Sequence, residues 1–436
     1  MDSGIAPRHP SAESRSEPGR RLLGFWSGTF LVVASMLGTG VFTTTGFLMA
    51  DLRSPYLVLA AWLIGGVIAL LGALSYGALA RQIPESGGEY LFLSRTLHPA
   101  AGYVAGWISL LVGFSGPLAA AASAFGEYTR AWFPGIPSAV IGTLVLILFS
   151  VIHAWNVRVG ANAQNIAVLI KAILISLFVA LGTTKMNLNP SPSPSAVSIP
   201  GFAMALVWVS FSYSGWNAVI YVAGEVADPA RNLPRSLLAG TLFVTVLYLA
   251  LNAVFVLAVP GEVIAGQLDV GRIVADQLGG PAWANGATAL IALALVTSVS
   301  SLVMTGPRVY ARIAEDGYLP AVLVQREGPP RAAILFQLVL ALVLLWTATY
   351  QALLTWIGFT LSLSTAAAVC GLMVERRRKG PEFSVPGWPW VPILFVVAVL
   401  AMTGLTVSRA PGPSLAGVGV LGLGWAFWYV SRSRPS

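Results

Sequence analysis

Long apolar runs without charged residues follow one another along most of the chain. The first extends from Leu22 to Ala50, and one membrane crossing needs about 20 apolar residues. Further runs predict spans at 54–80, 96–126, 131–157, 159–184 (interrupted only by Lys171), 201–224, 236–261, 284–307, 332–374, 390–408 and 411–431. The run at 332–374 is long enough for two spans, which a turn near Tyr350-Gln351 would divide. The pattern therefore predicts an all-α integral membrane protein with 12 transmembrane helices.

The first run contains a segment that interrupts its own helix at midspan. Gly38, Thr39 and Gly40 lie there, and each glycine costs about 1 kcal/mol relative to alanine in a helix interior. A break exposes amide N–H groups on one half-helix and carbonyls on the other, with opposite partial charges. These ends suit the carboxylate and the ammonium of a zwitterion. The alternative is that the glycines only let neighbouring helices pack closely.

A second interrupted span favours the binding interpretation. The sequence Phe211-Ser212-Tyr213-Ser214-Gly215-Trp216-Asn217 places small and polar residues at midspan of the sixth helix. Five spans separate the two breaks, so the two broken helices run in opposite directions. Matching breaks in oppositely oriented halves are the sequence signature of an inverted-repeat transporter with a midplane substrate site. Tyr213 and Trp216 could instead anchor the helix at a membrane interface, but both fall near midspan.

Composition agrees with a membrane location and narrows the partners. Of 436 residues, 56% are hydrophobic and 10% are charged, whereas soluble domains carry about 25% charged residues. The net charge of +8 comes from loops between apolar runs and does not indicate nucleic acid as a partner. Cys370 is the single cysteine, so an intrachain disulfide is impossible. No metal or hydrolase motif is present, and we expect no cofactor.

The distribution of Lys and Arg predicts the orientation. With the N-terminus inside, the cytoplasmic side holds most of the basic residues, including Arg20, Arg21, Arg81, Arg95, Arg158, Arg231, Arg235, Arg308, Arg312, Arg331 and the run Arg376-Arg377-Arg378-Lys379. The opposite side holds Arg53, Arg130, Lys185, Arg272 and Arg409. The positive-inside rule then places both termini in the cytoplasm of a multi-pass protein of the plasma (cell inner) membrane.

Several short motifs, taken in order, resemble the amino acid–polyamine–organocation superfamily, and most closely its L-type amino acid transporter branch. They are Gly38-Thr39-Gly40-Val41-Phe42, Pro84-Glu85-Ser86-Gly87-Gly88-Glu89-Tyr90, the segment 211–217 continuing to Arg231-Asn232-Leu233-Pro234-Arg235, and Arg308-Val309-Tyr310-Ala311-Arg312 leading to Asp316-Gly317-Tyr318-Leu319-Pro320. The resemblance implies alternating access in a core of two inverted five-helix repeats, plus two more helices. The predicted units are a disordered cytoplasmic tail at 1–20, the ten-helix core at 21–382, and two helices with a short tail at 383–436.

The resemblance also implies roles for residues at the breaks. The amides of Gly38–Gly40 would hold the substrate carboxylate, and carbonyls near Ser35, Met36 and Phe211 would take the amino group. Phe211 would be an aromatic gate, with Trp216 a second gating candidate. Thr39, Tyr213, Ser214 and Gly215 complete the predicted substrate site. Ser214-Gly215 departs from the two glycines usual in the family, and Ser298-Val299-Ser300-Ser301 lacks the glycines and asparagine common in the branch. Cys370 lies in a helix, so no disulfide-linked subunit is expected.

Lys171 is the candidate for coupling. An intramembrane lysine is costly and by default functional, and Gln164 shares its helical face. The resemblance implies that a lysine here replaces a sodium ion, bonding a carbonyl near Ser35–Gly38 and a hydroxyl for which Ser298 is the candidate. We therefore expect sodium-independent transport, by exchange or proton coupling. We expect the substrates to be neutral L-amino acids, because no other span carries a midplane charge.

Other functions stay open as alternatives. The chain could be an antiporter of cationic amino acids or polyamines, or an amino acid exporter. A channel would not need a gated, occluded site, and an intramembrane enzyme would need paired ionisable residues where only Lys171 lies. Glu85, Glu89 and Arg95, in the predicted loop after the second helix, could close an inner gate. Solvated loop charges are the simpler interpretation of these three residues.

Overall fold

The computed structural model describes residues 23–155, 161–184, 186, 198–315, 319–325 and 328–432, and these residues form helices and connecting loops. Within these ranges no strand is formed, only one isolated bridge between Leu23 and Val226. The first half contains α1 (Phe25–Met36), α2 (Gly40–Leu52), α3 (Pro55–Gln82), α4 (Gly88–Thr96), α5 (Pro99–Ile108), η1 (Ser109–Ser115), α6 (Gly116–Thr129), α7 (Ser138–Trp155) and α8 (Ala161–Thr183). The second half contains α9 (Ile199–Tyr213), η2 (Ala218–Glu225), α10 (Pro229–Leu257), α11 (Gly261–Ile264), α12 (Val270–Glu315), η3 (Ala321–Leu323), α13 (Arg331–Thr347), α14 (Tyr350–Lys379), η4 (Gly380–Glu382), α15 (Trp390–Arg409) and α16 (Pro411–Arg432).

The helices follow the apolar runs of the sequence. In the described part of the chain, 8 helices are long and apolar enough to cross a membrane, and 9 if the bent pair α1–α2 is one span. α8 and α13 contain shorter apolar helices. The run at 332–374 divides as predicted, because α13 ends at Thr347 and α14 begins at Tyr350. The chain is therefore an all-helical membrane protein.

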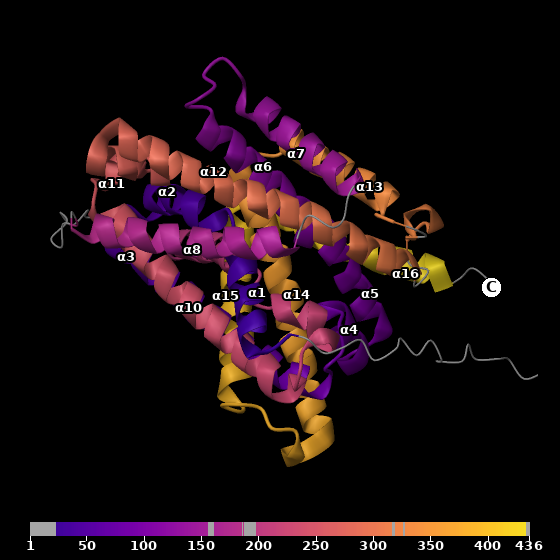
Figure 1. Ribbon diagram of the computed structural model, residues 1–436. Coiled ribbons are helices and arrows are strands. Elements are labelled where there is room, and N and C mark those ends of the chain that lie inside the picture. Colours follow the sequence, from indigo (N-terminus) through magenta and orange to yellow (C-terminus); the bar gives the residue numbers. More distant parts are fainter. Residues whose placement is uncertain are drawn as a thin grey trace, which may run out of the picture.

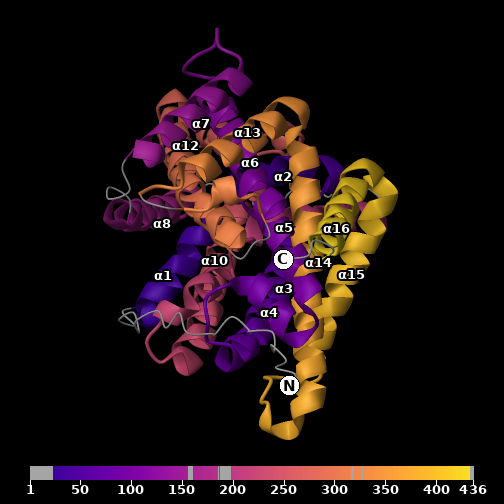
Figure 2. The same cartoon turned by 90° about the vertical axis from the view of Figure 1, so that its right-hand side faces the viewer.

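Figure 1 shows that the elongated helices cross one another in a single bundle. α2 is buried in this bundle, whereas α1 has an exposed side. α10 packs along α3 and α1, and α12 packs along α6. In Figure 2, α15 and α16 lie beside α14 at one side of the bundle, and α7, α12 and α13 lie together elsewhere. Large apolar side chains on the outer helices are exposed, such as Leu148, Leu335 and Val397. An apolar outer surface of this extent suits contact with lipid.

Two helices differ in detail from a regular span. The third span consists of α5, the π-helical segment η1 and α6, and Pro117 is the second residue after η1. Proline lacks an amide N–H and cannot continue the regular ladder of hydrogen bonds, so the irregular segment precedes it. The polar stretch 262–282 forms α11 and the beginning of α12, which kinks where Gly280 has a φ of 73°.

Candidate functional site

The first span breaks at Leu37-Gly38-Thr39, and α1 and α2 meet there at an angle of 44°. The Leu37 amide still donates to the Val33 carbonyl at 3.0 Å, and the Gly38 amide donates to the Met36 carbonyl at 2.6 Å. The first turn of α2 then leaves the amides of Thr39, Gly40 and Val41 without a backbone acceptor in the described chain. A helix N-terminus with free donors is a natural site for an anionic group.

The second break follows Tyr213, where α9 ends. Ser214 leaves the helical conformation with a ψ of 145°, and Gly215 has a φ of 98°, which L side chains rarely adopt. The Ala218 amide donates to the Gly215 carbonyl at 3.0 Å, and the chain continues as the 3₁₀ helix η2. A glycine is therefore required at 215, and the span resumes in a tighter helix than the one before the break.

The two breaks lie directly against each other. A Cβ atom on Gly215 would lie 2.7 Å from the Ser35 carbonyl oxygen, at the end of α1. A Cβ atom on Gly40 would lie 2.5 Å from Cα of Ser212, at the end of α9. Neither position has room for a larger residue, because both distances are shorter than real Cβ contacts. The sequence thus brings the ends of four half-helices to one place at midspan.

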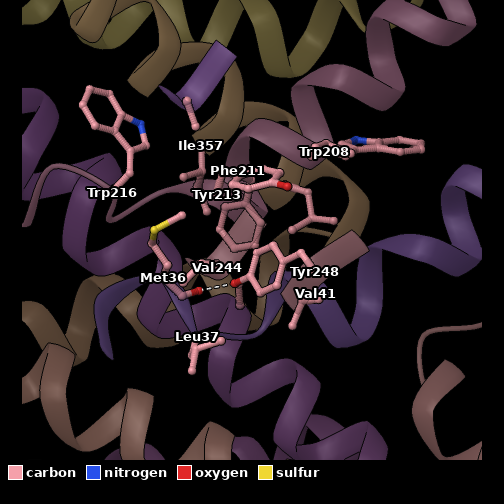
Figure 3. Packing of buried hydrophobic residues seen from close by; sticks show 14 of the residues in the cluster. Met36, Leu37, Val41, Trp208, Phe211, Tyr213, Trp216, Val244, Tyr248 and Ile357 are labelled. Atoms are coloured by element: carbon pink, nitrogen blue, oxygen red, sulfur yellow. Dashed lines mark hydrogen bonds between the residues drawn. The ribbon is translucent and has the colours of Figure 1, made fainter. Parts of the chain in front are cut away.

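Tyr248 of α10 fastens the carbonyl ends of both broken helices. Its hydroxyl donates to the Met36 carbonyl and, at 3.2 Å, contacts the Ser212 carbonyl as well. Figure 3 shows the Tyr248 ring reaching from α10 to Met36 beside Phe211 and Tyr213. Sequence reasoning missed this residue. Its one signal is a tyrosine at midspan of the apolar run 236–261.

The predicted site residues differ in exposure. Met36, Thr39, Phe211, Tyr213 and Trp216 are buried. Ser35 is exposed, whereas Gly38, Ser214 and Gly215 are intermediate. Of these residues, Ser35 is therefore the one that lies at the molecular surface.

The aromatic residues of the second break point to different neighbours. Tyr213 donates to the Trp62 carbonyl of α3 at 3.1 Å, and its ring lies 5.2 Å from that of Tyr248. Trp216 packs edge-on against Tyr76 of α3, with ring centroids 4.7 Å apart. The Phe211 carbonyl already accepts the Ser214 amide at 3.0 Å, which leaves its second lone pair for another donor.

Lys171 of α8 is 2% exposed and reaches the first break. Its Nζ donates to the Leu37 carbonyl at 3.3 Å, one residue before Gly38. Ser298 of α12 donates to the Ala294 carbonyl of its own helix at 3.0 Å. Among the described side chains no hydrogen bond joins Lys171 to Ser298. The side chain of Gln164 lies outside the described residues.

Three consecutive threonines fix the beginning of α2 to three different helices. Thr43 contacts the Tyr350 hydroxyl of α14 at 2.8 Å, and Thr44 contacts the Ser212 hydroxyl of α9 at 3.0 Å. Thr45 donates to Asn252 of α10. All three threonines are fully buried. The run of three threonines in an apolar span was the signal for this contact set, and sequence reasoning did not use it.

A membrane-embedded helical bundle with two interrupted helices meeting at midspan is the arrangement of a membrane transport protein. The chain belongs to the amino acid permease family, whose model matches residues 23–430. The family identifies a transporter of amino acids and not an enzyme.

Individual relatives cover most of the chain. It is 28% identical to the large neutral amino acids transporter small subunit 2 of Rattus norvegicus, over 94% of this chain and 81% of the relative. It is 27% identical to the serine/threonine exchanger SteT of Bacillus subtilis (strain 168), over 93% and 95%. The b(0,+)-type amino acid transporter 1 of Homo sapiens is 25% identical, over 94% and 88%.

Proposed function

We propose that this protein is a sodium-independent secondary transporter of neutral L-amino acids that works by alternating access, through exchange or proton coupling. The observation that carries the proposal is the contact between the two breaks. It brings the free amides at the start of α2 close to the carbonyl ends of α1 and α9. Opposite partial charges at one place match the carboxylate and ammonium groups of an amino acid.

In this proposal the amides of Gly38, Thr39 and Gly40 hold the substrate carboxylate. The Gly38 amide, now bonded to the Met36 carbonyl, would exchange that short local bond for the substrate. The carbonyls of Ser35, Met36 and Phe211 take the ammonium. These carbonyls lie at helix C-termini, where the last turn leaves acceptors without intrahelical donors. Thr39, Tyr213, Ser214 and Gly215 line the site, and Phe211 and Trp216 gate it.

Charge near the breaks favours neutral substrates. Lys171 brings an ammonium to the Leu37 carbonyl, and Glu225 lies at the far end of η2. A cationic substrate side chain would meet this ammonium at a cost of several kcal/mol, and the buried carboxylate of Glu89 beyond Trp216 already accepts hydrogen bonds from Tyr76, Asn217 and Tyr221. In this proposal the same ammonium, beside the Leu37 carbonyl, takes the place of a coupling sodium ion, so transport does not require sodium. Ser298 is the proposed second partner of Lys171 during the transport cycle.

The membrane topology is part of the proposal. Counting α8, α13 and α16 with the nine spans gives 12 crossings, with 21–382 as two inverted five-helix repeats and 383–436 as an added pair of helices. Basic residues at the ends of α12 and α14 support cytoplasmic termini by the positive-inside rule. We propose the plasma (cell inner) membrane as the location. The printed names of the relatives, an exchanger of serine and threonine and a transporter of large neutral amino acids, agree with neutral substrates.

Uptake into proteoliposomes tests the proposal. Vesicles preloaded with unlabelled alanine, serine or leucine should accelerate uptake of the labelled amino acid, equally with sodium or choline outside. Arginine and putrescine should neither compete nor accelerate uptake. Acceleration by an inward proton gradient without preloading would select proton coupling over exchange. Dependence on sodium, or tight binding of putrescine with none of serine or leucine, would contradict the proposal.

A further inference from the structure

Glu89, at the start of α4, is a buried carboxylate in a cytoplasmic loop region. It is 4% exposed, which contradicts the expectation of a solvated loop charge. Glu85, four residues earlier, behaves as expected: it pairs with Arg95 at 3.2 Å, and the two side chains are 56% and 58% exposed. The difference arises because the turn at Gly87 and Gly88, both with positive φ, directs α4 under η2.

Three neutral donors surround the Glu89 carboxylate. Oε1 accepts the Tyr76 hydroxyl of α3 at 3.2 Å and the side-chain amide of Asn217. Oε2 accepts the Tyr221 hydroxyl of η2. An ionised carboxylate is an acceptor only, so it matches a set made of donors. Hydrogen bonds to a charged acceptor are about twice as strong as neutral ones, which offsets the cost of burying the charge.

Two of these donors come from the second broken span: Tyr221 lies in η2, its second half, and Asn217 lies in the break before η2. Asn217 follows Trp216, and Tyr221 lies in the middle of η2. The same half-helix is also held by the Gly224 amide, which donates to the Ser86 hydroxyl at 3.0 Å. Tyr76, the third donor, is the ring on which Trp216 packs. The carboxylate therefore joins the α3–α4 segment to the residues adjoining Gly215.

The inner half of the first broken helix is tied to η2 in turn. The Leu23 amide donates to the Glu225 carbonyl at 3.1 Å, and the Ala227 amide donates to the Leu23 carbonyl at 2.9 Å. These two bonds form the isolated bridge between Leu23 and Val226. The end of η2 and the residues preceding α1 are thus one connected unit, and Glu89 is the charged contact between this unit and the α3–α4 segment.

We propose that Glu89 is a positioning residue that latches η2, and α1 through it, against the α3–α4 segment, and that this latch opens when the cytoplasmic side of the transporter opens. The proposal rests on alternating access as the mode of transport. Removal of the latch leaves the substrate groups at the breaks in place and lowers the population of the inward-closed state. A ligand that binds one state has an apparent Kd divided by the fraction of that state.

Opposite changes in the two KM values test the latch. Glu89→Gln keeps the shape but turns one acceptor oxygen into a donor that faces donors. We expect KM for uptake from the outside to rise about tenfold and KM for cytoplasmic-side substrate to fall. The reason is that losing a hydrogen bond to a charged group lowers the population of the inward-closed state by about this factor. Glu85→Gln, in the same loop, is the matched control and should change neither value. Parallel changes on both sides would overturn the latch.

A labelling experiment separates the latch from the identity of the substrate. Ala223 of η2 is 1% exposed, and Cys370 is the single native cysteine. In a Cys370→Ser background, Ala223→Cys should react with an impermeant maleimide from the cytoplasmic side about tenfold faster when Glu89→Gln is added. Tyr221→Phe, which removes the donor to Oε2, should give an intermediate rate. Unchanged labelling in both variants would overturn the latch even if transport of neutral amino acids is established.

Failure of the two proposals would look different. If Glu89→Gln speeds labelling while no amino acid is taken up, the latch stands and the proposed substrate falls. If uptake is normal but labelling and both KM values are unchanged, the proposed function stands and the latch falls. Thermal unfolding of each variant in detergent checks folding, and Tyr76→Phe offers a second route to the same weakening if Glu89→Gln does not fold.

Discussion

The two halves of the first broken helix are held in the bundle in different ways. α2 is buried from Gly40 to Met49, and its own side chains Thr43, Thr44 and Thr45 bond to three other helices. α1 has an exposed side with Trp26 and Phe30. Its backbone carbonyls receive bonds from side chains elsewhere, namely Ser236 to Phe25, Tyr248 to Met36 and Lys171 to Leu37 just beyond the helix.

From this difference we infer that α2 is the fixed half of the first broken helix and α1 is the half that can be released. Buried side chains that interlock with three helices cannot move without opening the core. A half-helix held by a few donors to its carbonyls can be released by the loss of those donors, at about 1 kcal/mol for each neutral bond and more for a charged one. We therefore expect substitutions of the three buried threonines of α2 to change stability, and substitutions of the donors to α1 to change transport.

The largest effect is expected at the contact between the breaks. Gly40→Ala should abolish transport, because its Cβ would lie 2.5 Å from Cα of Ser212 and overpacking costs about 1–3 kcal/mol. Gly38→Ala is the sharper probe of substrate binding, because the nearest atom to its Cβ would be the Met36 carbonyl oxygen at 3.8 Å. We expect it to fold normally and still lose transport, because the methyl group stands in front of the carboxylate site. Near wild-type uptake by both variants would contradict the proposal that these amides bind the substrate carboxylate.

A severe effect is also expected at Lys171. Lys171→Met keeps an unbranched side chain, one atom shorter, but leaves the buried Leu37 carbonyl without its donor. Transport should fall at least about tenfold, since bonds from charged groups are worth more than neutral ones. Uptake should be compared with sodium and with choline outside. Sodium-stimulated uptake in the variant, absent in the parent protein, would strengthen the assignment, whereas full activity without the lysine would contradict it.

An intermediate effect is expected at Tyr248. Tyr248→Phe preserves the ring packing against Trp62 and Tyr213 but removes the hydroxyl from the Met36 and Ser212 carbonyls. The Ser212 carbonyl would lose this donor, and the Met36 carbonyl would keep only the Gly38 amide, at a cost of about 1–3 kcal/mol. We expect a lower exchange rate with unchanged sodium independence. An unchanged exchange rate together with a lowered melting temperature would make Tyr248 part of the fixed framework instead.

The smallest effect on transport is expected at the threonines of α2. Thr44→Val removes the bond to the Ser212 hydroxyl while keeping a β-branched side chain of similar size. The free energy of unfolding should fall by about 1 kcal/mol, visible as a lower melting temperature in detergent. The exchange rate of the folded fraction should stay within about twofold of the parent protein, because we expect this bond to be present in all states of the transport cycle. A loss as large as that in Lys171→Met would erase the distinction between the two halves.

Much of the fold follows from local patterns in the sequence. Charge-free runs mark the helices because backbone in lipid must satisfy its own hydrogen bonds. The first break was predicted from Gly38 and Gly40, and the second from the small and polar residues around Gly215, whose φ of 98° favours glycine. The π-helical segment Ser109–Ser115 was not predicted, because it depends on Tyr310 of α12 donating to the Leu110 carbonyl as well as on the nearby proline.

The tertiary partners of the site could not be predicted in the same way. Tyr248 and Glu89 acquire their roles from residues that lie far away in the sequence, Met36 and Tyr221 respectively. A single sequence does not say which segments meet. Lys171 was recognisable because charge within a span is costly wherever it lies, and its coupling role remains a prediction.

The bridge at Leu23 and Val226 uses only peptide groups. Almost any side chain can replace either residue without removing it, and only a proline at 23 or 227 would delete a donor. The connection between the residues before α1 and the end of η2 is therefore insensitive to substitution, while the residues of the proposed substrate site remain free to vary. A protein built in this way can change its substrate through side-chain substitutions and keep the backbone bridge between the residues before α1 and the end of η2.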